Sequence, residues 1–97
     1  MRLVYAPRAL RDLRKIGSCY RSVADEKTAA AVAERISHVI NLIARQPYIA
    51  PRLRQRADVR SASVLRYPYV IFYRIRAGVV EVLHIRHTSR QPWEGEQ

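Results

Sequence analysis

The sequence predicts an α+β fold in which an antiparallel two-helix hairpin packs on one face of a small antiparallel sheet, in the order β-α-α-β-β-β. Three observations predict it. Apolar residues recur with helical spacing over 8–45, β-prone runs separated by turn signals fill 59–87, and a short β-prone segment precedes the first helix. A sheet this small needs its apolar face covered, and the helix hairpin is the only cover that the chain offers. The other face of the sheet should therefore be partly open.

The length and composition indicate one globular domain over residues 1–97. Hydrophobic residues make up 48% of the chain, which is enough for a core and argues against disorder despite the high charge. The single cysteine, Cys19, excludes an intrachain disulfide and is expected to be a small buried hydrophobe on the first helix. The sequence offers no metal framework, so we expect no cofactor. It also shows no signal peptide and no membrane-spanning apolar run, so we expect a cytoplasmic protein without a membrane partner.

The chain is strongly basic, with a formal net charge of +10 from 18 Arg and Lys against 8 Asp and Glu. Sixteen of these cations are arginine, which binds phosphate and carboxylate in a bidentate fork and stacks on flat rings. The charge is concentrated over 45–90, where ten arginines and two acids give a net charge of +8, whereas 1–44 carry +4. The surface therefore suits an anionic partner: nucleic acid, an acidic protein segment, or both.

The N-terminal elements are a strand and an amphipathic helix. The segment Arg2–Ala6 is short and β-rich and should form an edge strand, and Pro7 fits the first turn of the following helix. That helix is predicted from Arg8 to about Tyr20, with arginines dominating its outer face. Its apolar stripe consists of Leu10, Leu13, Ile16 and Tyr20.

The second helix has the strongest periodicity in the chain. Either Ser22 or Asp25 can cap its N-terminus, since these two residues have the spacing of a weak capping box. Arg45 lies near its C-terminus, where the helix dipole favours a cation, and Pro47 stops it. Its apolar stripe consists of Ala29, Val32, Ala33, Ile36, Val39, Ile40 and Ile43. The short connector between the two helices predicts an antiparallel hairpin.

Strand signals dominate after a loop over 46–58 that contains two prolines and three arginines. The strand candidates are Val59–Arg66, Tyr69–Arg76 and Val79–His87. Ala77 and Gly78 separate the last two strands, and Gly78 can take the positive φ of a tight hairpin turn. The polar tail over about 91–97 is expected to fray.

Several strings in this order resemble the RelE/ParE toxin superfamily. Tyr5–Ala9 (Tyr-Ala-Pro-Arg-Ala) resembles the start of these toxins, and Leu42–Pro47 (Leu-Ile-Ala-Arg-Gln-Pro) resembles the end of their second helix. The strongest matches are Tyr67–Ile75 (Tyr-Pro-Tyr-Val-Ile-Phe-Tyr-Arg-Ile) and Val82–Arg90 (Val-Leu-His-Ile-Arg-His-Thr-Ser-Arg). Together the matches span roughly residues 3–93. From these strings the chain is identified as a member of the superfamily, closer to the ParE-like members.

The resemblance implies the toxin component of a type II toxin–antitoxin system. ParE-like members inhibit DNA gyrase without needing hydrolytic residues, whereas RelE-like members are ribosome-dependent endonucleases that cut mRNA. The closer resemblance to ParE-like members favours DNA gyrase as the target, and mRNA cleavage on the ribosome is the alternative. Members of both kinds are neutralised by a small antitoxin, expected here to be acidic, whose C-terminal segment wraps around the toxin.

Cleaving RNA through attack of a 2′-hydroxyl needs a base for that hydroxyl, an acid for the leaving oxygen and cations for the phosphorane. By resemblance, Arg74 matches the family's mid-strand arginine, and His87 lies near the position where some relatives carry a catalytic histidine. Asp58 would complete a metal-independent set of acid, arginine and histidine. However, the sheet half contains no Lys, and no Tyr follows His87, which departs from the RelE-like pattern. The sequence leaves open whether the chain is an enzyme.

Binding residues are expected on two surfaces. Contacts to the target or to nucleic acid are predicted for Arg52, Arg54, Arg56, Arg60, Arg86 and Arg90. The groove formed by the two helices and the sheet edges should bind the antitoxin, with contacts from Leu10, Leu13, Arg14 and Trp93. Several residues also have a purely structural interpretation: His87 would hold the tail through a hydrogen bond, and Arg52, Arg54 and Arg56 would lie on a solvated loop. Arg74 would be a surface partner of Glu81 if the last hairpin turn has two residues, and His84 would be a half-buried strand residue.

Overall fold

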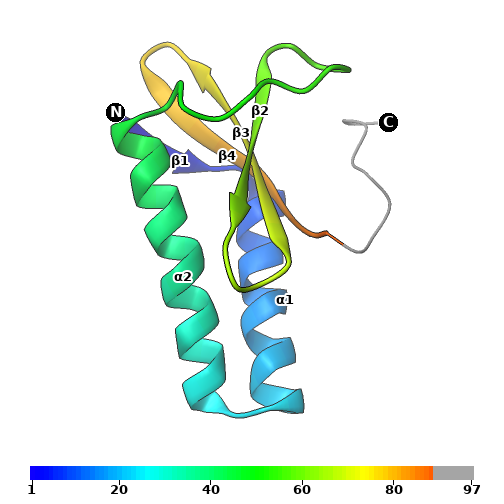
Figure 1. Ribbon diagram of the computed structural model, residues 1–97. Helices are drawn as coiled ribbons and strands as arrows, with labels where there is room; N and C mark the ends of the chain where they lie inside the picture. Colours follow the sequence, from blue (N-terminus) through cyan, green and yellow to red (C-terminus); the bar gives the residue numbers. More distant parts are fainter. Residues whose placement is uncertain (89–97) are drawn as a thin grey trace.

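The computed structural model describes residues 1–88, in which two helices and four strands follow one another in the predicted order. The elements are β1 (Arg2–Tyr5), α1 (Pro7–Val23), α2 (Glu26–Arg45), β2 (Val59–Val64), β3 (Tyr69–Arg76) and β4 (Val79–His87). Figure 1 shows the two helices side by side as a hairpin, with the sheet at the end of the hairpin that is farthest from the α1–α2 connector. The predicted α+β architecture is confirmed.

The junction between the helices is determined by one capping residue. α1 begins at Pro7, as predicted, but continues to Val23, so Ser22 lies inside this helix. The cap of α2 is therefore Asp25, whose carboxylate accepts a hydrogen bond from the backbone N–H of Thr28 at 2.7 Å. Because this hydrogen bond favours the ionised carboxylate, it lowers the pKa of Asp25 below its ordinary value of 3.8.

The sheet has the strand order β1-β4-β3-β2. β2, β3 and β4 form the predicted antiparallel meander, and β1 occupies the predicted edge position. β1 pairs with β4 in parallel, with Leu3 opposite Val80, so the sheet is mixed rather than wholly antiparallel as the sequence had predicted. Parallel neighbours need a long connection, and here the helix hairpin and the other strands supply it.

Two turns set the register of the meander. The predicted two-residue turn joins β3 to β4, and both of its residues have positive φ: 53° at Ala77 and 74° at Gly78. β2 ends at Val64 and not at Arg66, because Arg66 takes a positive φ of 78° in the turn before β3. A β-bulge in the middle of the β3–β4 pair adds one residue on β4, which increases the local twist.

The core lies between the helices and one face of the sheet. The apolar stripe predicted on α2 is confirmed at its centre, where Val32, Ile36, Ile40 and Ile43 are buried. They belong to one cluster with the sheet residues Ile71, Tyr73, Val80, Val82 and Ile85. Tyr73 is the largest fully buried side chain, and its hydroxyl donates a hydrogen bond of 2.7 Å to the carbonyl oxygen of Pro47. Burial raises the pKa of the Tyr73 hydroxyl above its ordinary value of 10.0.

α1 contributes less to the core than α2 does. Its one buried residue is Ala9, and the half-buried residues that pack against the core are Leu13, Ile16 and Tyr20. Leu10, predicted in the same stripe, is 42% exposed. Cys19 is exposed too, so the expectation of a buried thiol was wrong. The physical reason is that the stripe continues from Ile16 to Tyr20, four residues on, and leaves Cys19 beside it.

Candidate functional site

The two faces of the sheet have different environments. Because side chains alternate along a strand, Tyr69, Ile71 and Tyr73 face the helices, whereas Phe72 and Arg74 lie on the opposite side. We call that opposite side the outer face. Strand pairing places on it Phe72, Arg74, Glu81, His84 and Arg86. Of the candidate catalytic and target-contact residues on the strands, Arg74 and Arg86 lie on the outer face, whereas Arg60 pairs with Tyr73 on the helix side.

Arg74 lies directly opposite Glu81, as expected for a two-residue turn. Its Nε atom donates to Glu81 Oε1 at 2.7 Å, and both side chains are mostly buried. A second carboxylate, that of Asp58, lies 4.0 Å from the Arg74 guanidinium and 3.7 Å from that of Arg56. The structure thus brings Asp58 and Arg74 together and confirms the structural interpretation of Arg74 as the partner of Glu81.

His87 lies elsewhere. It is opposite Tyr69, and its ring meets the Tyr69 ring edge-on with centroids 5.4 Å apart. Since Tyr69 belongs to the core, His87 faces the helix side of the sheet. Tyr69 and Arg74 are five positions apart on β3, which corresponds to roughly 17 Å along the strand. The structure therefore does not bring His87 to Asp58 and Arg74.

The sequence did not reveal a buried pair that links α1 to the sheet. His84, 6% exposed, has its Nδ1 atom 2.7 Å from Asp12 Oδ2, and the same oxygen accepts the backbone N–H of Ile85 at 3.0 Å. The ring of His84 also stacks on Phe72 with centroids 5.8 Å apart. Asp12 thus binds the edge of β4 beyond Val82, the last residue of β4 that pairs with β1. One signal was present in the sequence: Asp12 is the only acid among residues 1–24.

The arginines predicted to contact a target differ in their surroundings. Arg60 donates through Nη1 to the carbonyl oxygens of Ala50 at 2.6 Å and Tyr48 at 3.2 Å, so it holds the loop before β2. Arg86 lies over the Phe72 ring at 5.7 Å and donates to the carbonyl oxygen of His87 at 3.0 Å. The side chains of Arg52 and Arg54 are exposed on the same loop. Arg90 lies outside the described residues.

The residues predicted to bind an antitoxin lie on α1, apart from Trp93, which is outside the described residues. Leu10 and Arg14 are both exposed, and because they are four positions apart they share one side of the helix. Leu13 is half-buried and packs against the core. The outer surface of α1 therefore combines an exposed apolar side chain with an adjacent cation.

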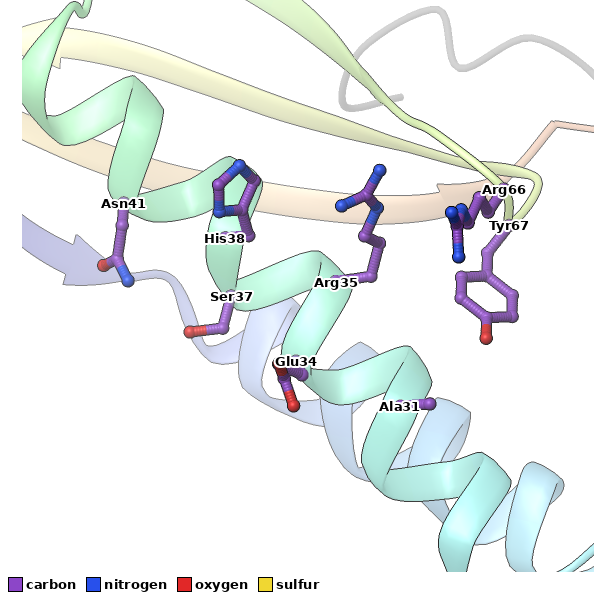
Figure 2. Close-up of a pocket in the computed structure, with 8 residues that line it drawn as sticks. All are labelled: Ala31, Glu34, Arg35, Ser37, His38, Asn41, Arg66 and Tyr67. Atoms are coloured by element: carbon purple, nitrogen blue, oxygen red, sulfur yellow. The ribbon is translucent and has the colours of Figure 1, made fainter.

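A hollow of about 500 Å³ lies between α2 and the β2–β3 turn (Figure 2). Its lining consists of Ala31, Glu34, Arg35, Ser37, His38, Asn41, Arg66 and Tyr67. Arg35 Nε donates to the carbonyl oxygen of Leu65 at 3.4 Å, which ties α2 to the turn. In Figure 2 the side chains of Glu34 and His38 point away from each other, so the hollow presents no paired acid and base. None of the predicted site residues lines it.

Residues 1–88 contain neither a metal-binding cluster nor a membrane-spanning helix. Within residues 1–88, no group of three or more His, Cys, Asp and Glu side chains is arranged to hold a metal ion. In the same residues, neither helix is long and apolar enough to cross a membrane.

One protein-family model matches nearly the whole chain. The family model described as the ParE toxin of the type II toxin–antitoxin system parDE matches residues 3–92. No curated protein sequence matches the chain significantly.

Solved structures of toxins share the fold. A chain of the chromosomal ParDE system from P. aeruginosa superposes with a TM-score of 0.77 at 22% identity, over 90% of this chain and 95% of that one. The isolated E. coli RelE toxin gives a TM-score of 0.70 at 22% identity, over 93% and 86% of the two chains. A chain of the intact E. coli RelBE toxin–antitoxin complex gives 0.69 at 24% identity, over 92% and 98%. At these identities the likeness shows the fold alone.

Proposed function

The chain belongs to the ParE toxin family of type II toxin–antitoxin systems, and we propose that it acts in the cytoplasm by binding and inhibiting DNA gyrase. On this proposal the protein works through contact and catalyses no hydrolysis. The match to the ParE model over residues 3–92 supports it. The structural likeness extends to ParDE and RelE chains alike, so the choice of gyrase rests on the sites within this chain.

The separation of His87 from Asp58 and Arg74 is the observation that carries the proposal. RNA cleavage requires an acid, a base and cations around one phosphate. The three residues that would supply such a set are divided between the two faces of the sheet, roughly 17 Å apart along the strand. Arg74 also has its charge balanced by Glu81 and Asp58. These positions favour inhibition by contact over mRNA cleavage.

We further propose that a cognate antitoxin neutralises this toxin by binding the outer surface of α1. The solved relatives include the ParDE system and the RelBE toxin–antitoxin complex. In this chain, exposed Leu10 next to Arg14 fits a partner segment that carries both apolar and acidic side chains. Such an interface should weaken with salt to the extent that its arginines contribute to binding.

The test is a supercoiling assay in which purified gyrase is titrated with the purified toxin. We expect wild-type protein to inhibit supercoiling, and His87→Ala to inhibit equally because no proton transfer is needed. A parallel reaction supplies ribosomes programmed with a defined mRNA. Cleavage of that mRNA together with unaffected gyrase would overturn the proposal, and loss of cleavage in His87→Ala would then identify a catalytic histidine.

A further inference from the structure

The loop between α2 and β2 displays two large apolar side chains in succession. Tyr48 is 64% exposed and Ile49 is 60% exposed. The exposed arginines Arg52 and Arg54 follow within five residues. Figure 1 shows this loop, residues 46–58, running from the end of α2 across to the β2 side of the sheet and out to the side before it returns to β2. We call residues 48–54 the loop tip.

The loop backbone is held by two side chains of the sheet. The Tyr73 hydroxyl donates to the carbonyl oxygen of Pro47, and Arg60 Nη1 donates to those of Tyr48 and Ala50. Ala50 itself is buried. The two arms of the loop are also bonded to each other: the backbone N–H of Leu53 donates to the carbonyl oxygen of Val59 at 2.8 Å, and that of Ser61 donates to the carbonyl oxygen of Pro51 at 3.1 Å. The exposed side chains are therefore presented from a firmly bonded backbone.

This rigidity distinguishes the loop tip from other exposed apolar residues. Single exposed hydrophobic side chains are common on proteins, and Val23 and Leu65 are such cases here, at 74% and 67% exposure. At the loop tip, two of them are adjacent, and the guanidinium of Arg60 lies 5.3 Å from the centroid of the Tyr48 ring. A side chain oriented in advance loses less conformational entropy when a partner binds it.

The composition of the loop tip favours a protein partner. Tyrosine and arginine are enriched among the residues that contribute most to protein–protein binding. Nucleic acid would use the arginines but would gain little from an exposed isoleucine such as Ile49. Within residues 1–88, Arg52 and Arg54 form no ion pair, whereas the acid of the loop, Asp58, lies beside Arg56 and Arg74. The fitting partner surface has an apolar depression bordered by carboxylates.

We propose that the loop tip is the contact by which this toxin binds its protein target, with Tyr48 and Ile49 in an apolar depression and Arg52 and Arg54 beside acidic groups. The inference rests on the proposed function, in which the target is gyrase. The loop leads into β2, at the opposite edge of the sheet from β1 and the start of α1. An antitoxin on the outer surface of α1 would thus bind a different region.

The experiment compares two matched pairs of double variants in the gyrase supercoiling assay. Tyr48→Ala/Ile49→Ser is matched by Val23→Ser/Leu65→Ser, which removes equally exposed apolar side chains elsewhere. Arg52→Glu/Arg54→Glu is matched by Lys27→Glu/Arg76→Glu, which makes the same change in net charge on other exposed residues. The loop variants keep the backbone carbonyls that accept from Tyr73 and Arg60, so the loop should remain in place. Thermal unfolding checks this for each variant.

We expect each loop variant to need at least about tenfold more protein for half-maximal inhibition, which corresponds to about 1.4 kcal/mol of binding free energy. The matched variants should inhibit like wild type, and all variants should bind the antitoxin equally. Loop variants that inhibit like wild type would overturn the inference and leave the gyrase proposal standing. Failure of wild type itself to inhibit would overturn both.

Two further outcomes would also contradict the inference. One is loss of antitoxin binding in the loop variants with inhibition of gyrase unchanged. The other is a nucleic-acid role, measured with a fluorescent DNA duplex. In that case the arginine variant alone would lose duplex binding and gyrase inhibition together, and Tyr48→Ala/Ile49→Ser would change neither.

Discussion

The arginines of the outer face and those of the loop tip differ in what surrounds them. On the outer face, Arg74 lies between two carboxylates and Arg86 covers an aromatic ring. On the loop tip, Arg52 and Arg54 are exposed and form no ion pair within the described residues. The number of arginines identifies a basic protein, whereas the neighbours of each arginine decide whether it stabilises the fold or is presented to a partner.

The largest effect is expected where two groups of β4 lose the hydrogen-bond partner that α1 supplies. Replacing Asp12 with alanine should lower the free energy of unfolding by about 2–3 kcal/mol, because His84 and the N–H of Ile85 both lose their acceptor. Urea unfolding measures this. Glu34→Ala, which removes an exposed acid, is the control and should stay within about 0.5 kcal/mol of wild type. An equally small change for Asp12→Ala would show that the pair contributes little to the fold.

A smaller effect is expected for the arginine of the outer face. Glu81→Ala should cost about 1–2 kcal/mol, since Arg74 keeps only Asp58 at 4.0 Å. The double variant Arg74→Ala/Glu81→Ala should lose less than the sum of the two single variants, because each single change leaves one mostly buried charge with fewer partners. If the losses in unfolding free energy of the two single variants, measured in urea, add up to that of the double variant, Arg74 is not the structural residue described here.

Tyr73→Phe should cost about 1 kcal/mol, because it removes the hydroxyl that holds the loop at Pro47. The raised pKa of Tyr73 means that its contribution is fully present below pH 10.0 and declines as the pH rises through the higher folded pKa. The difference in stability between wild type and Tyr73→Phe should therefore narrow above pH 10.0. Amide exchange over 48–50 that stays as slow in Tyr73→Phe as in wild type would argue against this role.

Asp25→Ala should destabilise the start of α2 modestly at neutral pH, since Thr28 loses its hydrogen-bond acceptor. The folded pKa of Asp25 lies below 3.8, so its contribution is present above that pH and is lost as the pH falls through the folded pKa. Acid titration followed by circular dichroism should show the stabilities of wild type and Asp25→Ala converging as the pH falls. A difference that is independent of pH would rule out the carboxylate as its source.

The smallest effect on stability is expected at the loop tip. Arg52→Ala/Arg54→Ala should change the free energy of unfolding by no more than about 0.5 kcal/mol, because neither side chain has a partner acid in the described part of the chain. Urea unfolding again measures this free energy. A loss of unfolding free energy comparable to that of Glu81→Ala would contradict the distinction between the arginines of the outer face and those of the loop tip.

Local patterns predicted most of the fold. Helical spacing gave the α2 stripe, which is buried at Val32, Ile36 and Ile40, because this signal depends only on residues three and four apart. The two-residue turn at Ala77 and Gly78 predicted the pairing of Arg74 with Glu81 for the same reason. Such features could be predicted from the sequence because the interacting residues are near neighbours in the chain.

Contacts between distant segments could not be predicted from the sequence. The pairing of Asp12 with His84 joins residues 72 positions apart, and the parallel pairing of β1 with β4 depends on how the helix hairpin returns to the sheet. The separation of His87 from Arg74 follows from the bulge and the alternation along β3 and β4, which sequence alone does not define. The rigid presentation of Tyr48 likewise depends on Arg60, twelve positions away.

Whether this toxin acts by contact with gyrase is tested most directly by controlled expression of the chain in bacteria. DNA synthesis and protein synthesis are followed by pulse labelling within minutes of induction. We predict that DNA synthesis falls first, that a DNA-damage response follows, and that His87→Ala leaves both effects unchanged. A collapse of protein synthesis that precedes any change in DNA synthesis, with accumulation of cleaved mRNA ends, would contradict the account.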